Sequence, residues 1–219
     1  MVMEFEKQSI PFFNSLLTKT DEAYYKSEIK ENDWGYSVTA TRLDKGKPVI
    51  VGFNWGVDNA WLKKGNRYGN QKDYPNAVFK DLYNDLGSFK KVVNQFNRYL
   101  PEANEGVQIN FCFFRSQTES QISQKDLDLC IPLFEELIAY LEPNMIILFS
   151  SSLFRFFKNK NYILNSTDQS FTDRNRTVYV SKGQMLIKNV QTNYYLLPHP
   201  NYPISGLLRM QAWEYCFGN

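Results

Sequence analysis

Hydrophobic positions along the chain gather in continuous runs that are separated by helical patterns. The segments KPVIVGFN (47–54), VQINFCFF (107–114) and NMIILFS (144–150) are apolar without regular alternation. Such runs are typical of parallel strands that are covered on both faces. A further run, NYYLLPHP (193–200), predicts the last strand. Because helical segments separate these runs, we expect an α/β fold with three layers, in which a mostly parallel central sheet of about four strands is flanked by helices.

Apolar residues at three- and four-residue spacing indicate the helices between these strands. The clearest example is DLDLCIPLFEELIAYL (126–141). Further helices are expected in four segments: 10–32, 75–99, 152–159 and from about Ser205 onward. Asp21 is a candidate N-cap within the first of these segments, and Gly87 marks a break in the second.

The segment RTVYVSKGQMLIKN (176–189) alternates between polar and apolar residues around Lys182–Gly183. This pattern predicts an antiparallel hairpin that is added to the parallel sheet. The polar segment 159–175 is expected to be a loop, and a second long loop is expected over 55–73. Neither a repeat nor a linker is visible, so the whole chain, 1–219, is predicted to be a single domain.

Composition narrows the possible classes of function. The 219 residues are 43% hydrophobic and 16% aromatic, which excludes a disordered chain, and the net charge of +2 is too small to indicate nucleic-acid binding by itself. Three widely spaced cysteines without a C-x-x-C pair exclude a zinc knuckle and a four-cysteine iron–sulfur cluster. One histidine and dispersed carboxylates form no obvious metal cage, so we expect neither a metal nor another cofactor.

The remaining sequence signals concern location and other chemistries. A signal-peptide pattern and an apolar run of membrane length are both lacking, so we expect a cytoplasmic protein without a membrane partner. The phosphate-binding patterns G-x-x-x-x-G-K-[ST] and G-x-G-x-x-G are missing, and the serines at 150–152 do not form a G-x-S-x-G elbow. The sequence carries no signal for the oligomeric state.

Three of the predicted strands end in unusual residues. GFNWG (52–56) follows the first apolar run, NFCFFRS (110–116) ends the second, and PHPNYP (198–203) follows the last. Sites in an open parallel sheet form at the carboxyl ends of strands, so these segments are expected to meet. His199 lies between two prolines that fix its backbone, and a rigidly held imidazole suits a charge-stabilising role. The alternative is a histidine with a structural role only.

These segments resemble the motifs of the uracil-DNA glycosylase superfamily. The segment GFNWG (52–56) is similar to the family's first motif, G-x-[DN]-P-[GY], and the pair His199-Pro200 is similar to its histidine–proline motif. Asn110 matches the asparagine that the family has near the end of its second strand. The ordered motifs extend over residues 47–209, which is most of the chain.

The resemblance implies an enzyme that hydrolyses the N-glycosidic bond of uracil or a related damaged base in single- or double-stranded DNA, after base flipping. His199 would donate a hydrogen bond to the base carbonyl and stabilise the leaving anion. Asn54 would orient the attacking water, and Asn110 would read the base edge with one donor and one acceptor. No cofactor is implied, since the cysteine pattern excludes the iron–sulfur members of the family.

Other residues of the motifs are expected to support base binding. Gly52 and Gly56 would allow the backbone to approach the base closely, and Phe53 or Tyr68 would stack on it. Simpler roles compete with each of these. Phe53 follows a buried strand and fits the core, and Asn110 fits a buried amide that the sheet satisfies.

Basic and aromatic residues are interleaved in the segment that follows the first motif. This composition fits a groove for nucleic acid, although a solvated loop is the more common role for such charges. The candidate DNA contacts are Lys63, Lys64, Arg67, Arg115, Tyr202 and Arg209. Leu207, Leu208 and Arg209 follow the last motif at a plausible distance for a wedge that replaces the flipped base, and Tyr202 is an equal candidate.

The first motif departs from the family at Trp55, which stands where proline is usual. With Asn54 in place of aspartate, the motif resembles the mismatch-specific and single-strand-selective branches of the family. An asparagine cannot act as a general base. Asp58 is the nearest spare carboxylate. The alternative function is therefore a catalytically inactive module of the same fold that binds nucleic acid or a free nucleobase. A Trp55 ring that filled the space for the base would favour this alternative.

Overall fold

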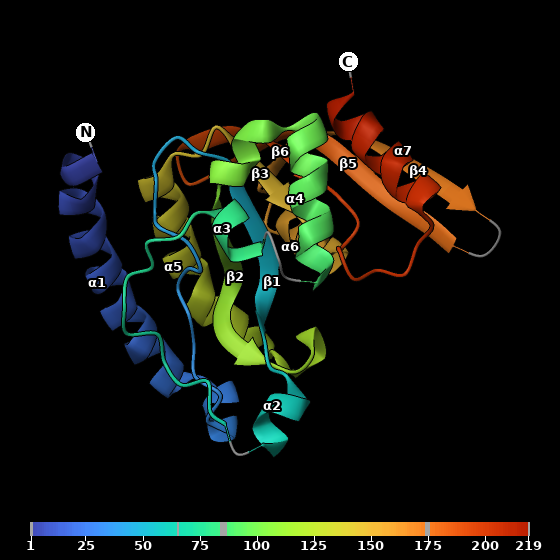
Figure 1. Cartoon of the computed structure of the whole chain (residues 1–219). Helices are drawn as coiled ribbons and strands as arrows, with labels where there is room; N and C mark the ends of the chain where they lie inside the picture. Colours follow the sequence, from blue (N-terminus) through green and yellow to red (C-terminus); the bar gives the residue numbers. More distant parts are fainter. Residues whose placement is uncertain (1, 65, 84–86, 174–175, 219) are drawn as a thin grey trace.

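A computed structural model of the protein describes residues 2–64, 66–83, 87–173 and 176–218. In these segments the central element is a six-stranded mixed sheet with the order β2-β1-β3-β6-β5-β4 (Figure 1). Its strands are β1 (Val49–Gly56), β2 (Val107–Ser116), β3 (Met145–Leu148), β4 (Ile163–Asp173), β5 (Arg176–Ile187) and β6 (Val190–Leu196).

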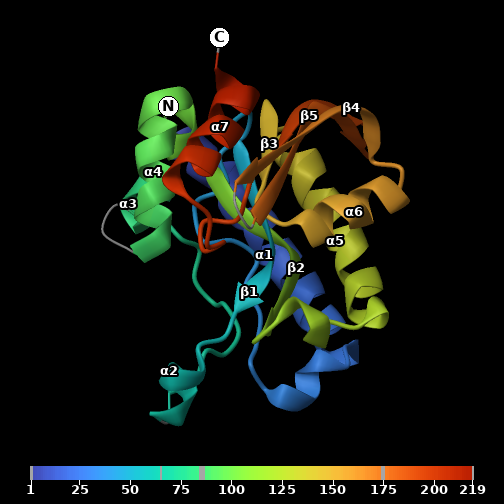
Figure 2. The same cartoon turned by 90° about the vertical axis from the view of Figure 1, so that its right-hand side faces the viewer.

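Helices cover both faces of the sheet (Figure 1, Figure 2). One face packs against α1 (Val2–Lys26), α5 (Gln124–Leu141) and α6 (Ser151–Asn159). The other face packs against α3 (Phe79–Tyr83), α4 (Gly87–Tyr99) and α7 (Gly206–Phe217). The short helical elements are α2 (Asn59–Lys63), η1 (Ile29–Asn32), η2 (Pro101–Glu105) and η3 (Glu119–Gln121). The predicted three-layer α/β fold is confirmed.

The parallel part of the sheet explains the continuous apolar runs. β1 pairs with β2 and β3, and β3 pairs with β6, all in parallel. Along β1, Val49 and Val51 belong to the core under α1 and α5, whereas Ile50 belongs to the core under α4 and α7. Successive residues of the apolar run are buried against one core or the other, so the sequence shows no alternation there.

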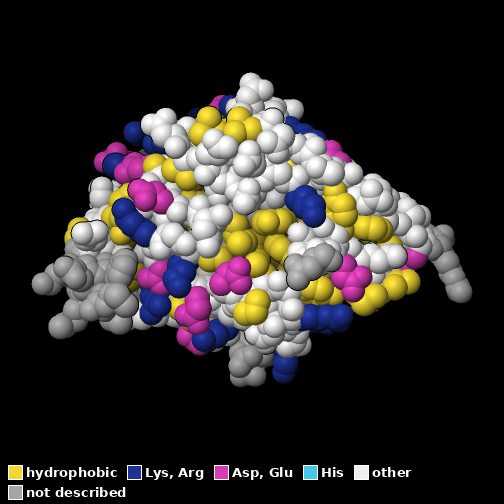
Figure 3. Space-filling view, turned by 90° about the horizontal axis from the view of Figure 1, so that it is seen from above, with side chains coloured by type: hydrophobic (Ala, Val, Ile, Leu, Met, Phe, Trp, Pro, Cys, Tyr) yellow, Lys and Arg dark blue, Asp and Glu magenta, His cyan; other side chains and the backbone are white. Residues whose placement is uncertain are grey.

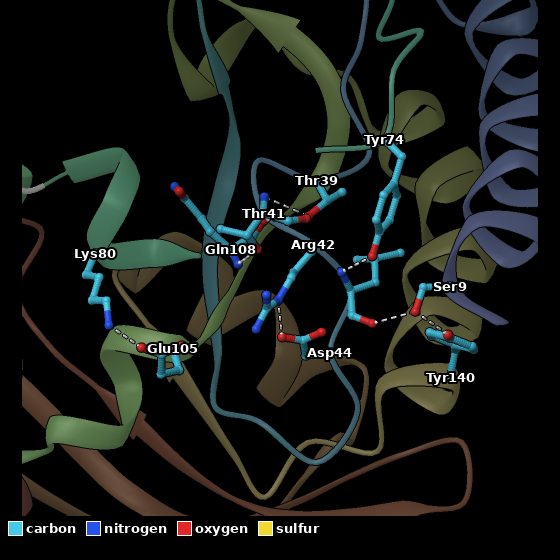
Figure 4. A network of polar contacts seen from close by, with 11 residues as sticks. Ser9, Thr39, Thr41, Arg42, Asp44, Tyr74, Lys80, Glu105, Gln108 and Tyr140 are labelled. Atoms are coloured by element: carbon cyan, nitrogen blue, oxygen red, sulfur yellow. Dashed lines mark hydrogen bonds and ion pairs between the residues drawn. The ribbon is translucent and has the colours of Figure 1, made fainter. Parts of the chain in front are cut away.

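A segment between η1 and β1 lies along the outer edge of β2 and is fixed there by polar contacts (Figure 4). The Thr39 hydroxyl donates to the carbonyl of Gln108 at 3.1 Å, and the Gln108 backbone N–H donates to the Thr41 hydroxyl at 2.9 Å. Further along, the Leu43 N–H donates to the Tyr74 hydroxyl at 2.7 Å. These bonds cover an edge that would otherwise expose unpaired backbone groups.

The predicted loop over 159–175 is wrong for residues 163–173, which form β4. Most β4 side chains are exposed, so the strand lacks the apolar signal of the parallel strands. It is held by antiparallel pairing with β5 along its length. At its centre, Asp168 accepts a hydrogen bond from Ser181 at 2.6 Å and forms an ion pair with Lys158.

The expected antiparallel hairpin exists, but its predicted turn is wrong. β4 and β5 form the hairpin, and β5 runs straight through Lys182–Gly183. Gly183 lies between Ser166 of β4 and Tyr194 of β6. A Cβ atom at Gly183 would lie 2.2 Å from the carbonyl oxygen of Asn165. The glycine therefore allows close approach of an irregular neighbouring strand and does not mark a turn.

Two further expectations need correction near the N-terminus and the first motif. The first helix, α1, begins at Val2 and ends at Lys26, and Asp21 lies inside it, where its carboxylate accepts a hydrogen bond from the Tyr36 hydroxyl. The GFNWG segment is the end of β1 itself, and the expected long loop contains α2. The helices predicted at 75–99, 126–141, 152–159 and after Ser205 are confirmed, with α4 beginning at Gly87.

Candidate functional site at the carboxyl ends of the parallel strands

The strand order creates a switch point between β1 and β3. From β1 the chain continues to β2 on one side, and β3 and β6 follow on the other side. Ligand sites in open α/β sheets lie outside the carboxyl ends of the strands at such a point. In Figure 1 this is the lower end of the sheet, the end where α2 lies. The opposite end, viewed in Figure 3, shows hydrophobic side chains among charges of both signs and no histidine.

Gly52 and Asn110 lie just beyond the level at which β3 ends, since Val51 pairs with Leu148. The predicted position of Asn110 near the end of its strand is wrong, because β2 continues for six residues to Ser116. Gly52 and Asn110 lie opposite each other in the β1–β2 pairing, and a Cβ atom at Gly52 would lie 2.1 Å from Asn110 Oδ1. Glycine at this position is therefore what allows the Asn110 side chain to lie across β1. Asn110 as a residue is 5% exposed, but its amide is not among the described side-chain groups that are buried without a partner. Since no described residue hydrogen bonds to this amide, its polar atoms are reached by solvent and are available to a ligand or to water.

Asn54 lies two residues after Gly52, on the same face of β1. Its amide nitrogen donates to the Ser116 hydroxyl at 2.7 Å and to the Trp55 carbonyl at 2.9 Å. The Ser116 hydroxyl in turn donates to the carbonyl of Thr118. The Asn54 amide is thus held toward β2, and its Oδ1 is the atom left to accept a hydrogen bond.

Trp55 turns away from the neighbouring strand β3. Its indole N–H donates to the carbonyl of Ser37, which lies beyond the outer edge of β2. Arg115 donates to the Ser37 hydroxyl at 2.6 Å, and its guanidinium lies 5.0 Å from the centre of the Tyr68 ring. Burial lowers the pKa of Arg115. The bonds from Trp55 and Arg115 to Ser37 hold both side chains on the β2 side of β1.

His199 follows β6 and is exposed. Its Nδ1 accepts a hydrogen bond from the backbone N–H of Asn201 at 3.1 Å, which leaves Nε2 to carry the proton of the neutral ring. Desolvation lowers the pKa of His199, the Glu119 carboxylate raises it, and the Arg209 guanidinium lowers it further. The net shift is downward, so near neutral pH the ring is an uncharged donor through Nε2.

Arg209 supports the His199 loop. Its guanidinium donates to the carbonyls of His199, Pro200 and Tyr202, at 3.4, 3.3 and 2.9 Å. The role predicted for it, a DNA contact, therefore competes with these backbone bonds. Tyr202 is exposed beside Arg209. A cavity of about 560 Å³ lies between this loop and α4 and is lined in part by Lys91 and Gln95.

The other predicted residues do not gather at one point. Phe53 packs against the core under α1 and α5, the face opposite Asn110. Gly56 ends β1 with no described atom within 4 Å of its Cβ position. Tyr68 is held between Asp58 and Arg115, since its hydroxyl accepts a hydrogen bond from the Asp58 N–H at 2.8 Å.

The basic residues predicted to contact DNA lie on and after α2. Lys63, Lys64 and Arg67 are exposed. In Figure 1, α2 extends from the carboxyl end of β1, so these charges and the strand-end groups share one end of the molecule. This placement is compatible with a track for phosphates beside the site.

Three polar residues of the site were not predicted. Ser116 holds Asn54, Ser150 caps α6 by accepting from the Leu153 N–H, and the Ser150 hydroxyl also donates to Glu119 Oε1 at 3.2 Å. The two serines end or follow a buried strand at the same sheet edge, and that position was the available signal. Glu119 follows β2 by three residues, and nothing in its local sequence distinguishes it.

The described segments hold no group of three or more histidine, cysteine, aspartate or glutamate side chains that suits a metal ion. Across the same residues, no helix has the length and apolar character needed to cross a membrane. Comparison of the sequence with protein-family models and with curated proteins found no match in either. The geometry of the strand ends therefore carries the functional argument.

Proposed function

We propose that this protein is a DNA glycosylase that hydrolyses the N-glycosidic bond of uracil or a related damaged base. The observation that carries the proposal is the Asn110 amide, which makes no hydrogen bond with a described residue and lies against Gly52 at the switch point of the sheet. An amide presents one donor group and one acceptor side by side, which matches the edge of a pyrimidine or purine base. Asn54 lies near the end of β1 and His199 follows β6, at the same sheet edge.

The reaction separates charge, and His199 is suited to the side that becomes negative. When the glycosidic bond breaks, its electron pair leaves with the base, whose carbonyl oxygen gains negative charge. A neutral imidazole that donates through Nε2 stabilises this oxygen without first losing a proton. The hydrogen bond from the Asn201 N–H to Nδ1 supports this tautomer.

Asn54 is suited to the water on the other side of the reacting sugar. Its amide nitrogen is held by Ser116 and by the Trp55 carbonyl, so Oδ1 has a fixed direction and accepts a hydrogen bond from water. Orientation of this kind lowers the entropic part of the barrier. It does not remove a proton, because an amide is not a base.

The second candidate is a module of the same fold that binds a nucleobase without catalysis. It is favoured by the amide at position 54, where a general base would be more effective. The Trp55 ring does not add to this case, since its indole is bonded to Ser37 beyond β2 and points away from β3 and β6. The enzyme is therefore our first proposal.

The test is incubation with oligonucleotides that contain uracil or other damaged bases, single- and double-stranded, followed by alkali to cleave abasic sites. We expect strand cleavage with the wild-type protein. His199→Ala is expected to lower turnover about 10²–10³-fold, and Asn54→Ala to lower it less, with nearly unchanged melting temperatures. Absence of product across the panel, together with retained binding of the oligonucleotides, would select the binding module.

A further inference from the structure

Asn54 cannot act as a general base, and Glu119 is a carboxylate that is hydrogen bonded to a strand end of this site. Its carboxylate Oε1 accepts a hydrogen bond from the hydroxyl of Ser150, the residue that follows β3 and Phe149. In the sheet, β3 lies between β1 and β6. A carboxylate attached to the end of β3 therefore lies between the strand ends that carry Asn54 and His199.

The chain leading to Glu119 is fixed from both sides. Asn54 donates to Ser116, Ser116 donates to the Thr118 carbonyl, and Thr118 is the N-cap of η3, in which Glu119 is the first residue. The side chain of Gln121 accepts from the Thr118 N–H and closes a capping box. The position of Glu119 is thus tied to the same hydroxyl that holds Asn54.

Glu119 also has free hydrogen-bonding capacity. Oε1 is occupied by Ser150, whereas no described residue donates to Oε2. Asp58, the carboxylate that the sequence offered, is engaged instead at the start of α2, where Oδ1 accepts from the Ala60 N–H at 2.7 Å. Between these two carboxylates, Glu119 is the one attached to the centre of the candidate site.

We propose that Glu119 is the general base of this site, which removes a proton from the water that Asn54 orients; the inference rests on the proposed glycosylase function. The water oxygen forms a bond to the anomeric carbon of the sugar, and one of its protons moves to Glu119 Oε2. The electron pair of the glycosidic bond leaves with the base, toward the hydrogen bond of His199. The proton held by Glu119 then passes through solvent to the base anion, so one water yields a sugar hydroxyl and a neutral base.

The first test is a pH–rate profile of base release with Glu119→Gln, which keeps an oxygen for Ser150 but cannot take a proton. We expect kcat to fall about 10²-fold, the acid limb of the profile to disappear, and the affinity for DNA to be retained. Glu119→Asp should restore part of kcat and the acid limb. Glu22→Gln, on the exposed surface of α1, removes the same charge elsewhere and should match the wild type.

The second test does not depend on catalysis, since it follows the titration of His199 by NMR. The ring signals are unambiguous because His199 is the only histidine. The charged groups that act on this ring are Glu119 and Arg209. Glu119→Gln should lower the apparent pKa of His199, and Glu22→Gln should not change it. An unchanged value in Glu119→Gln would mean that the carboxylate is not beside the ring and would overturn the inference.

The outcomes separate the two proposals. If the wild type releases base and Glu119→Gln does so at the same rate, the general base is refuted and the glycosylase stands. If the wild type releases no base from any substrate while Glu119→Gln shifts the His199 titration, the glycosylase is refuted, and the catalytic role of Glu119 falls with it although its place beside the ring is supported.

Discussion

Two polar residues of β2, Gln108 and Asn110, are bonded in different ways. At the beginning of the strand, the backbone of Gln108 is bonded to Thr39 and Thr41, and these bonds attach a long segment to the sheet edge (Figure 4). Two residues further on, the Asn110 side chain is also mostly buried, but no described residue hydrogen bonds to its amide. A missing partner alone does not mark a site, because Gln108 Oε1 and Asn104 Oδ1 are buried without one among the described residues. We therefore expect the backbone bonds of Gln108 to matter for stability and the Asn110 amide, which lies against Gly52, to matter for ligand binding.

The largest expected effect is on the salt dependence of DNA binding. It tests whether charges that attract DNA lie at the carboxyl end of the sheet. Replacement of Lys63, Lys64 and Arg67 by glutamine should reduce the slope of log affinity against log salt by about 2, since each lost phosphate contact to a single strand removes roughly 0.7. Binding titrations between about 50 and 200 mM salt measure this slope.

The matched control changes the same charge at the opposite end. Lys45, Lys47 and Lys188 are exposed near the beginning of β1 and before β6. Their replacement by glutamine should leave the slope unchanged. If both triple variants gave the same slope, the two ends of the sheet would not differ in DNA binding.

The next effect concerns the unpaired amide. Asn110→Ala should weaken binding of a base-containing ligand about 10- to 100-fold, because a hydrogen-bonded amide in a closed site contributes about 1–3 kcal/mol. The free energy of unfolding should change little, since the amide has no described partner in the fold. Ligand titration and urea denaturation of the same variant check both statements. A large loss of stability with unchanged binding would assign Asn110 to the fold.

Thr41→Val should give the reverse pattern. The Thr41 hydroxyl accepts from the buried backbone N–H of Gln108, and valine would leave that N–H without a partner. We expect a loss of about 1–3 kcal/mol in the free energy of unfolding, measured by urea denaturation, with ligand affinity retained. Lost affinity without lost stability would contradict the division of roles along β2.

The smallest expected effect is the pH dependence contributed by His199. Its pKa is lowered from 6.5 in the folded protein, mainly by desolvation, so the unfolded chain binds the proton more readily. The contribution to stability is present above about pH 6.5 and is lost as the pH falls through the lower, folded value. The free energy of unfolding, measured by urea denaturation, should therefore fall slightly more between about pH 7.5 and 5 for the wild type than for His199→Gln. Identical losses would show that the ring is fully hydrated.

The sequence predicted those parts of the molecule in which burial follows from local pattern. The run around Ile50 predicted a strand covered on both faces, and the spacing in 126–141 predicted α5. β4 was missed because its exposed side chains carry no periodic signal and its pairing is made by the backbone. Gly183 was misread because a glycine in a close strand contact looks, in sequence, like one in a turn.

The candidate site was predictable in part for a similar reason. Asn54 lies near the end of β1 and His199 follows β6, both at strand ends that the sequence marks clearly, and strand order brings those ends to one edge. Asn110 lies inside β2, which extends beyond it to Ser116. The contact of Asn110 with Gly52 depends on the register between β1 and β2, which sequence does not reveal. Glu119 was missed because its place depends on a hydrogen bond across strands, to Ser150.

The outermost strand, β4, bears on how copies of the chain behave when they are crowded together. A long strand at the margin of a sheet is a template on which another chain can add, and natural proteins oppose this with charged residues. Asp168, at the middle of β4, is committed to Ser181 and Lys158, and the surrounding side chains are mostly polar and exposed. An incoming strand would have to strip water from this ion pair and would gain little apolar contact in return. The polar character that hid β4 from sequence analysis is thus also a safeguard against aggregation.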